Sequence, residues 1–414
     1  MTTKNNIPAG YKDSAVGIIP QEWEVTTLGK LGKVMSGLTY SPNDISDTGI
    51  LVLRSSNIQN GMLCMVDNVY VNTVSYNPVK TGDILICVRN GSKNLIGKSA
   101  YITPHYDGVA FGAFMSVYRS THNNYLKHLF NSDIFYKNVH RNLGATINSI
   151  NGNDLKKFII PIPPIAEQRK IAEILGVWDE AIEKQNRLIE KLELRKRALM
   201  QRLLTGRIRL PGFTTPWQKV KLGEIGKFDK GVGVPKEKIV SEGCKAITYG
   251  EIYTKYDYVI KDFASYIDSD TAQTSKQISS GAIIFAGSGE TLEDIGKCVA
   301  FIDNDKAYAG GDIIIFNPSI EVDSLVLSYI LNSPVAVAQK RRYGQGHSVV
   351  HIYQKDLARI EFELPSLPEQ KAIAEVLTTA DDEIATHRKK LDALRLQKRG
   401  LMQQLLTGKT RVKI

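Results

Sequence analysis

The sequence has no long hydrophobic run and few cysteines. Its longest apolar stretches, such as 282–286, stop far short of the ~18 residues that a membrane-spanning helix needs. The first residues, 1–6, are not followed by the apolar segment of a signal peptide. No C-x-x-C pair occurs among the four cysteines, Cys64, Cys87, Cys244 and Cys298. We therefore expect a soluble, cytoplasmic protein without a zinc site or a disulfide framework.

Motifs for phosphate binding and metal-dependent hydrolysis are missing as well. The segment from Gly91 to Ser99 resembles a phosphate loop but carries one residue too many between its glycines. Its counterpart in the second half of the chain ends Gly296-Lys297-Cys298 and lacks the first glycine at that spacing. We interpret both segments as turns between strands. No H-E-x-x-H motif or paired carboxylates stand out, so we expect this chain to bind no metal and no cofactor.

What the sequence does have is positive charge. Its 414 residues include 53 Lys and Arg against 43 Asp and Glu, a net charge of +10. Hydrophobic residues make up 43% and charged residues 23%, which excludes a disordered chain. A basic protein of this kind either binds a polyanion, most often nucleic acid, or has a well-solvated surface.

The chain is a tandem duplication. The run EQRKIAEIL that begins at Glu167 matches EQKAIAEVL that begins at Glu369, 202 residues later. The same offset holds without a gap to LMQRLLTG, which ends at Gly206, and LMQQLLTG, which ends at Gly408. A repeat of this length determines the whole architecture of a chain.

Each copy has two unlike parts, which gives four segments. Short apolar runs broken by Gly, Asn, Asp and Pro predict mixed α/β (α+β) domains over residues 1–160 and 211–363. Residues 161–210 and 364–414 each predict one long helix, about 165–205 and 367–407. Prolines stand at the starts of these helices, and glycines stand where a C-terminal cap belongs.

The long helices carry a coiled-coil pattern. Apolar residues follow 3–4 spacing from Ile171 to Leu203 and from Ile373 to Leu405. Polar residues interrupt the pattern at matching places, Gln185 and Lys196 in one copy and His387 and Lys398 in the other. We predict one antiparallel coiled coil with pseudo-twofold symmetry, in a register that places Gln185 opposite Lys398 and Lys196 opposite His387. An amphipathic helix lying on a globular core is the alternative interpretation.

The chain resembles the specificity subunit of type I restriction–modification systems. The resemblance covers nearly the whole chain and rests on four motifs: IPAGYK at 7–12, VGIIP at 16–20 with WE at 23–24, PIPPIAEQ at 161–168, and LPSLPEQ at 364–370. Four features recur in both copies: the proline-rich segment before the helix, the Glu-Gln pair, the apolar helix and the terminal LLTG.

The resemblance implies a function. Each variable domain would be a target recognition domain that reads one half of a split, asymmetric double-stranded DNA sequence. The paired helices would set the gap between the halves and help to dock two methyltransferase subunits. In this family those subunits use S-adenosylmethionine to methylate adenine, and separate motor and endonuclease subunits translocate and cleave DNA.

The chain itself is predicted not to be an enzyme. An adenine methyltransferase needs a glycine-rich cofactor loop and an Asn/Asp-Pro-Pro-aromatic motif. Neither is present, since Asn77-Pro78 is followed by Val79 and Asn317-Pro318 by Ser319. S-adenosylmethionine is therefore expected on the partner methyltransferase.

Candidate DNA contacts lie in three polar segments at matching positions of the two copies. Arginine can read guanine, asparagine adenine, and glutamate can accept a hydrogen bond from cytosine. A glycine-containing loop at 340–348 would serve the second domain. The predicted contacts are Arg54, Ser55, Asn57, Arg89, Asn90, Lys93, Arg141 and Thr146 in the first copy, and Tyr249, Glu251, Ser288, Lys340, Arg341, Arg342, His347 and Ser348 in the second. Solvated loops that diverged after duplication are the alternative.

Charge is unevenly distributed between the domains. Residues 1–160 carry 15 basic and 10 acidic side chains, whereas residues 211–362 carry 17 and 19. The second domain must therefore rely on a local basic cluster. Basic residues also recur on the two helices at 195–197 and 398–399, where they either form a solvated face or contact DNA or partner subunits.

Two other functions are weighed against this one. A nucleotide-dependent DNA-modifying enzyme is disfavoured by the missing cofactor motifs. A coiled-coil scaffold whose globular domains bind protein partners is disfavoured by the loop chemistry, because Arg, Asn, Gln and Lys around glycines suit base edges better than an apolar interface.

Overall fold

The computed structural model describes residues 7–73, 75–143, 148–346 and 349–414. The chain forms two compact units. Unit 1 comprises Met1–Asn186 and Lys389–Ile414, and unit 2 comprises Arg187–Arg388. Each unit thus holds one globular domain and part of each long helix. The predicted segment boundaries at 160, 210 and 363 are not tested by this division and remain predictions.

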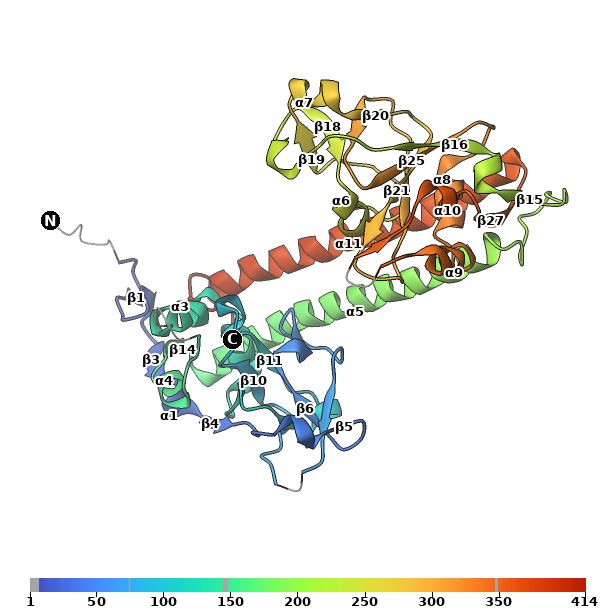
Figure 1. Cartoon of the computed structure of the whole chain (residues 1–414). Coiled ribbons are helices and arrows are strands. Elements are labelled where there is room, and N and C mark those ends of the chain that lie inside the picture. The colour runs from blue at the N-terminus through green and yellow to red at the C-terminus, as the bar shows by residue number, and fades with distance from the viewer. Residues whose placement is uncertain (1–6, 74, 144–147, 347–348) are drawn as a thin grey trace. The chain divides into compact units, whose positions relative to one another are not determined.

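Unit 1 is built from short strands and helices, shown in blue to green in Figure 1. Its strands are β1 (Tyr11–Lys12), β2 (Ile19–Pro20), β3 (Glu24–Thr27), β4 (Lys33–Ser36), β5 (Ile45–Ser46), β6 (Ile50–Leu53), β7 (Ile58–Gln59), β8 (Met62–Leu63), β9 (Val69–Val71), β10 (Ile84–Cys87), β11 (Ser99–Tyr101), β12 (Ala110–Phe111), β13 (Met115–Arg119) and β14 (Ile159–Ile162). Its short helices are α1 (Leu28–Leu31), α2 (Asn123–Leu129), α3 (Asp133–Asn142) and α4 (Gly152–Lys156), with 3-10 turns η1 (Pro42–Asp44), η2 (Ser55–Asn57), η3 (Lys93–Leu95) and η4 (Pro104–Tyr106).

Unit 2 repeats this inventory. Its strands are β15 (Gln218–Lys221), β16 (Gly226–Lys230), β17 (Ile239–Val240), β18 (Cys244–Ile247), β19 (Ser265–Ile267), β20 (Lys276–Ile278), β21 (Ala282–Ala286), β22 (Ser288–Gly289), β23 (Cys298–Phe301), β24 (Ala307–Ala309), β25 (Ile313–Pro318), β26 (Val350–His351) and β27 (Glu361–Leu364). Its short helices are α6 (Tyr249–Thr254), α7 (Ser269–Thr274), α8 (Ser324–Leu331), α9 (Pro334–Tyr343) and α10 (Gln354–Leu357), with 3-10 turns η5 (Leu222–Glu224) and η6 (Lys236–Lys238).

The sheet topology confirms the duplication and the mixed α/β class. A four-stranded antiparallel sheet has the order β11-β10-β13-β4 in unit 1 and β23-β21-β25-β16 in unit 2. A second sheet contains one parallel pair in each unit, β6 with β12 and β18 with β24. Because the strands of the four-stranded sheet and of the parallel pair have counterparts in the same places, the two domains are copies of one fold.

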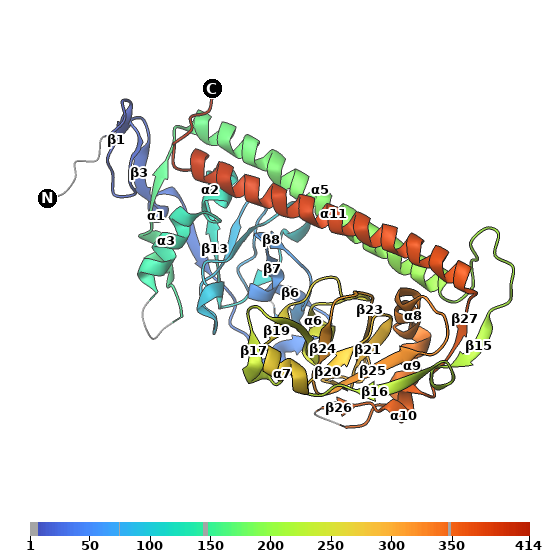
Figure 2. The same ribbon diagram turned by 90° about the horizontal axis from the view of Figure 1, so that it is seen from above.

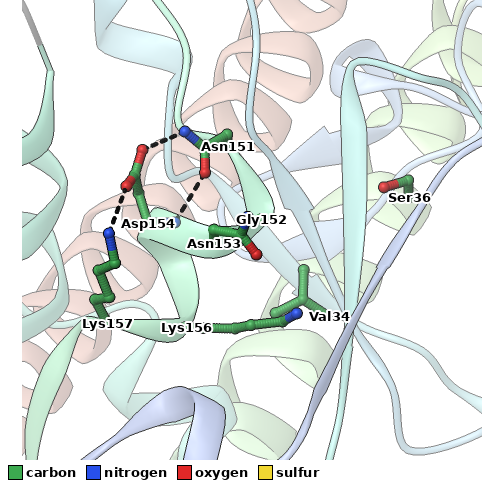
Figure 3. A pocket seen from close by; sticks show the side chains of 8 residues that line it. All are labelled: Val34, Ser36, Asn151, Gly152, Asn153, Asp154, Lys156 and Lys157. Carbon is green, nitrogen blue, oxygen red and sulfur yellow. Dashed lines mark hydrogen bonds and ion pairs between the residues drawn. The ribbon is translucent and has the colours of Figure 1, made fainter.

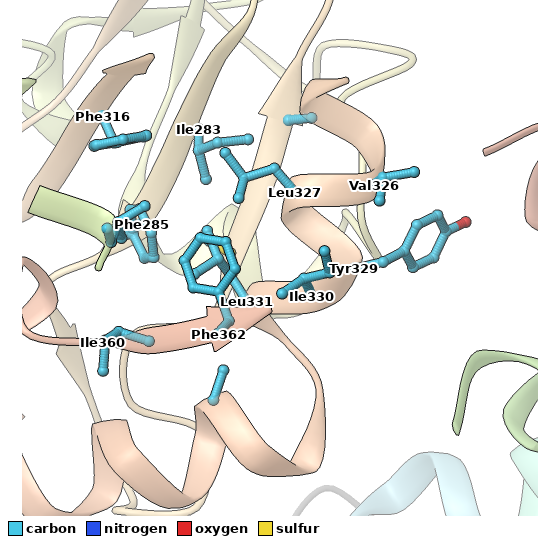
Figure 4. Packing of buried hydrophobic residues seen from close by; sticks show 14 of the residues in the cluster. Ile283, Phe285, Phe316, Val326, Leu327, Tyr329, Ile330, Leu331, Ile360 and Phe362 are labelled. Atoms are coloured by element: carbon cyan, nitrogen blue, oxygen red, sulfur yellow. The ribbon is translucent and has the colours of Figure 1, made fainter. Parts of the chain in front are cut away.

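The core of each domain forms where the central sheet meets the helices. In unit 2, α8 packs on the sheet, and Leu327 and Leu331 lie in one buried cluster with Phe285 of β21 (Figure 4). The run Ala282–Ala286 is buried throughout because every residue in it is apolar. The ring of Tyr329 instead points away from this cluster and places its hydroxyl on the long helix α11.

The long helices are α5 (Ile165–Leu203) and α11 (Leu367–Leu405), each of 39 residues. At the start of each helix, a glutamine side chain bonds back to the segment that precedes the helix. Gln168 Nε2 donates to the Pro163 carbonyl at 2.7 Å, and Gln370 Nε2 donates to the Pro365 carbonyl at 2.8 Å. Just beyond the C-terminal end of each helix lies a glycine in the left-handed region, Gly206 at φ +65° and Gly408 at φ +70°. The predicted ends of both helices are thereby confirmed.

Ion pairs show that the two helices run antiparallel. In unit 2 the pairs are Glu193–Arg388, Arg195–Glu383 and Lys196–Asp381. The residue number falls along α11 as it rises along α5. In unit 1, Asp179 pairs with Lys398, and Glu167, nearer the start of α5, pairs with Arg411, just beyond α11 (Figures 1 and 2). The antiparallel coiled coil is confirmed in each unit.

The contacts of the two units are reciprocal. Lys196 and Asp179 belong to the first copy, and Lys398 and Asp381 are their counterparts 202 residues later. Lys196–Asp381 and Lys398–Asp179 are therefore the same contact with the copies exchanged. The predicted pairing of Lys196 with His387 is not tested by these ion pairs, so the finer register remains a prediction.

The glutamate of each Glu-Gln pair joins its domain to the coiled coil. Glu167 is 1% exposed and accepts a hydrogen bond from Trp23 Nε1 at 2.9 Å. Glu369, also 1% exposed, accepts one from Trp217 Nε1 at 3.0 Å. Each carboxylate also pairs with an arginine, Arg411 or Arg209. The repeated Glu-Gln motif thus has a structural role, because it fixes where each domain meets the helices.

Among the described residues, no helix is long and apolar enough to cross a membrane. The four cysteines are free thiols.

Candidate nucleic-acid interface

Three polar segments of unit 1 that are far apart in the sequence meet at one place. Asn90 Nδ2 donates to Ser55 Oγ at 3.0 Å, which joins the loop after β10 to η2. Arg89 forms an isolated bridge with Ser149, and Asn148 Nδ2 donates to the Gly91 carbonyl at 3.0 Å. The segments 54–57, 89–92 and 148–149 therefore form one surface, which we call the unit 1 loop cluster.

The equivalent segments of unit 2 also meet. Tyr253 Oη, on α6, donates to the Ser288 carbonyl at 2.9 Å. Ser288 pairs with His351 in a short two-stranded sheet, and the two side chains share a hydrogen bond of 2.9 Å. A bridge between Gln345 and His351 brings in the loop after α9. We call this convergence of 249–253, 287–290, 345–346 and 349–351 the unit 2 loop cluster.

The structure divides the predicted contact residues into exposed and buried groups. Those with exposed side chains are Arg89, Lys93, Arg141, Tyr249, Arg341 and Arg342, and those that are half-buried are Arg54, Ser55 and Asn90. Asn57, Glu251, Ser288 and Lys340 are buried. Thr146, His347 and Ser348 lie outside the described residues.

Two of the buried polar residues hold the loops in shape. Asn57 is fully buried, and its Oδ1 accepts from the Arg54 amide at 2.9 Å. Glu251 caps α6 by accepting from the Thr248 amide at 2.7 Å, and it also accepts from Ser265 Oγ at 2.9 Å. Their polar atoms are occupied inside the domain, so these two side chains position the clusters from behind.

Lys340 differs from its predicted environment. The segment 340–343 is not part of a flexible loop but the last turn of α9, and Lys340 points inward from it. The side chain is 1% exposed, and its Nζ donates to the Gly296 carbonyl at 2.6 Å. Burial lowers the pKa of this amine. As placed here, Lys340 is not a surface cation, whereas Arg341 and Arg342 on the same turn are.

A hollow of about 510 Å³ opens beside the third segment of unit 1. It lies between β4 and α4, and its lining includes Ser36, Asn151, Lys156 and Lys157 (Figure 3). Lys157 pairs with Asp154 across 3.6 Å. The hollow therefore adds a polar, partly basic wall next to residues 148–149.

Charges are paired more completely in unit 2. Its paired lysines in the globular domain include Lys219, Lys221, Lys245 and Lys276. Arg341 approaches Glu293 at 3.6 Å but remains 46% exposed in its side chain. This agrees with the charge count of the sequence, in which the second domain is not basic overall, and the last turn of α9 presents Arg341 and Arg342 at its surface.

Nothing in the described part of the chain forms a group of three or more His, Cys, Asp or Glu residues that could hold a metal ion. The arrangement offers hydrogen-bond donors, acceptors and cations on protruding loops, which is the chemistry of recognition.

Comparison with known proteins decides the family. The family model described as the type I restriction modification DNA specificity domain matches twice, at residues 20–194 and 214–396. The chain belongs to this DNA specificity family.

Relatives of the DNA specificity family match along the chain. A Methanocaldococcus jannaschii protein named as the specificity subunit of the type I restriction enzyme MjaX is 28% identical over 435 residues, which cover 97% of each chain. The EcoKI specificity subunit of Escherichia coli K12 is 28% identical over 205 residues, covering 47% of this chain and 44% of its own.

Solved structures share the fold. The S subunit of a type I restriction–modification system from M. genitalium has a TM-score of 0.56 at 16% identity, covering 98% of this chain and 99% of its own. A chain from a structure of type I R-M complex assembly and conformational transition has a TM-score of 0.57 at 18% identity, covering 95% and 99%.

Sequence reasoning missed one residue of each specificity domain that stands beside the loop clusters. Phe114 contributes its carbonyl and its ring to the Arg89 loop, and Asp312 contributes its carbonyl to the Gly287 loop. A single residue in a turn carries no periodic signal, so only the fold identifies these positions.

Proposed function

We propose that this chain is the DNA-recognition subunit of a type I restriction–modification complex, and that each specificity domain reads one half of a split, asymmetric target. One observation carries the proposal. Three separated polar segments converge in both units at equivalent places, yet with different side chains. Two copies of a fold that present different donors and acceptors suit two different half-sites.

The chain supplies site selection and no chemistry of its own. Methyl transfer from S-adenosylmethionine to adenine belongs to two partner methyltransferase subunits, and translocation and cleavage belong to motor and endonuclease subunits. Docking of two identical partners is supported by two exposed leucines, since Leu194 is 60% exposed and its counterpart Leu396 is 68% exposed. Equivalent apolar anchors on the two helices suit two copies of one partner.

Selection from a pool of random duplex DNA tests the proposal. The purified complex of this chain with its methyltransferase should enrich a motif of two short specific halves separated by a gap of fixed length. Enrichment of an unbroken motif, or of none, would contradict the reading of one half-site by each domain.

Replacing Arg341 and Arg342 together with alanine should weaken DNA binding and flatten its salt dependence. Each phosphate contact contributes about 0.9 to the slope of log K against log salt, so losing two should lower the slope by about 2. The slope is measured by fluorescence anisotropy between low and moderate salt. Lys219→Ala with Lys221→Ala is the matched control, because these two cations of β15 already pair with Glu361. An unchanged slope in the arginine variant would exclude phosphate contact by α9.

Lengthening both helices should lengthen the recognised gap. Seven residues inserted after Asn186 in α5 and seven after Arg388 in α11 keep the heptad pattern and add about 10 Å of helix, or about 3 base pairs. The gap is read from the selected motif. The control places the same seven residues between Pro211 and Gly212, which are exposed and outside both helices, and should leave the gap unchanged. An unchanged gap in the variant with lengthened helices would show that the helices do not set the gap between the half-sites.

A further inference from the structure

A three-residue turn stands at the same place beside the loop cluster in both specificity domains. In unit 1 it connects β12 to β13 through residues 112–114, and in unit 2 it connects β24 to β25 through residues 310–312. β12 and β24 are the parallel partners of β6 and β18, and β13 and β25 occupy the same place in the four-stranded sheets. Phe114 and Asp312 are therefore equivalent residues, each the last before the strand.

Phe114 is an apolar ring at the surface among polar loops. The residue is 57% exposed, so its ring is not part of the hydrophobic core. Its carbonyl accepts from the Val88 amide at 3.0 Å and from the Arg89 amide at 3.1 Å, which fixes the turn to the Arg89 loop. The Arg89 guanidinium carbon lies 5.8 Å from the centre of the ring. The ring and the guanidinium are thus presented together.

Asp312 is held in the same way but offers a carboxylate. Its carbonyl accepts from the Gly287 amide at 2.7 Å, next to Ser288 in the unit 2 loop cluster. A Cβ at Gly287 would come within 2.9 Å of this carbonyl, so the two loops touch closely. The residue is exposed and has a φ of +58°, a backbone conformation that residues other than glycine adopt at a cost in free energy. The carboxylate is thus held at the surface beside the loop cluster.

We propose that position 114 in unit 1 and position 312 in unit 2 are base-reading residues that help to give the two domains their different specificities. The Phe114 ring contacts the methyl group of a thymine, beside a guanine read by Arg89. The Asp312 carboxylate accepts a hydrogen bond from the N4 amino group of a cytosine. Both pairings follow from the groups that bases display in the major groove. The inference rests on the proposed function.

The alternative for Asp312 is that it only forms the turn, because aspartate and asparagine adopt positive φ more readily than other residues. Asp312→Asn separates the two roles. Asparagine keeps the turn, but its amide favours adenine over cytosine. Phe114→Leu and Phe114→Ser make the corresponding pair in unit 1, since leucine keeps an apolar contact with the methyl group and serine removes it.

The experiment selects motifs from random duplex DNA with the full complex carrying each variant. We expect Asp312→Asn to lose a cytosine preference at one position of one half-site, with discrimination falling about tenfold or more. Phe114→Ser should relax one thymine position in the other half-site, and Phe114→Leu should retain it. Each variant should leave the opposite half-site unchanged.

Wild-type motifs at every position from both Asp312→Asn and Phe114→Ser would overturn the inference while leaving the proposed function intact. A wild-type complex that selects no split motif would instead overturn the proposed function, and the inference with it. Loss of all binding by Phe114→Ser together with normal behaviour of Phe114→Leu counts in favour of the apolar contact.

Discussion

Replacing Asp381 with asparagine should lower the free energy of unfolding by about 3 kcal/mol. Asp381 is the counter-ion of Lys196, whose side chain is 10% exposed, and it accepts from Tyr329 Oη at 2.5 Å. The Lys196 ammonium also lies 4.7 Å from the centre of the Tyr258 ring. Removing the carboxylate leaves a buried ammonium without a compensating charge, which is the costly case.

The neighbouring residue provides the control for this variant. Asp382 is exposed, and its pair with Lys261 spans 3.4 Å at the surface, so Asp382→Asn should change stability by less than about 1 kcal/mol. Adding Lys196→Met to Asp381→Asn should recover part of the loss, because the unpaired charge is then removed. Urea denaturation followed by tryptophan fluorescence measures all three. Equal stability of the Asp381 and Asp382 variants would show that the buried pair does not hold unit 2 together.

Acid should destabilise unit 1 through His128. This histidine is the counterpart of Tyr329, and its side chain is 2% exposed with Nδ1 3.6 Å from Asp179 Oδ2. Burial, together with the Lys398 and Lys127 ammonium groups, lowers its pKa to about 2. Its Nε2 is buried without a hydrogen-bond partner in the described part of the chain. The folded protein therefore keeps the ring neutral.

The sign of the effect follows from the unfolded chain, where the histidine pKa is near 6.5. Below that value the unfolded state binds a proton that the folded state excludes. The free energy of unfolding therefore decreases as the pH is lowered, by at most about 1.4 kcal/mol per pH unit. Between pH 7.5 and 5.0 the loss should be about 2 kcal/mol. Comparing urea midpoints of wild type and His128→Gln at both values isolates this contribution. The same pH dependence in both proteins would exclude His128 as its source.

Periodicity made the helices and their pairing predictable. A repeat with a constant offset of 202 residues, a 3–4 apolar pattern and terminal glycines define α5 and α11 without knowledge of the fold. The polar breaks at Gln185 and Lys196 are buried, as a seam residue must be. What the pattern could not supply was the partner of Lys196, because the choice of Asp381 depends on how side chains reach across the seam.

Residue type alone could not separate contact residues from structural ones. The sequence groups Arg341, Arg342 and Lys340 as one cationic loop, yet a helical turn directs the lysine inward while the arginines stay exposed. Glu251 has the chemistry of a cytosine reader but serves as a helix cap. Conversely, no pattern in the sequence marks Phe114 as a surface residue, yet it lies exposed beside the Arg89 loop, to which its carbonyl is bonded.

A methylome shows whether this chain selects a split DNA site. The chain is expressed with its candidate methyltransferase in a host that lacks other DNA methylation, and modified bases are mapped by long-read sequencing. We expect a two-part adenine motif that disappears when this chain is omitted. A soluble complex that leaves no motif, or a motif that persists without the chain, would contradict it and favour a scaffold that binds protein.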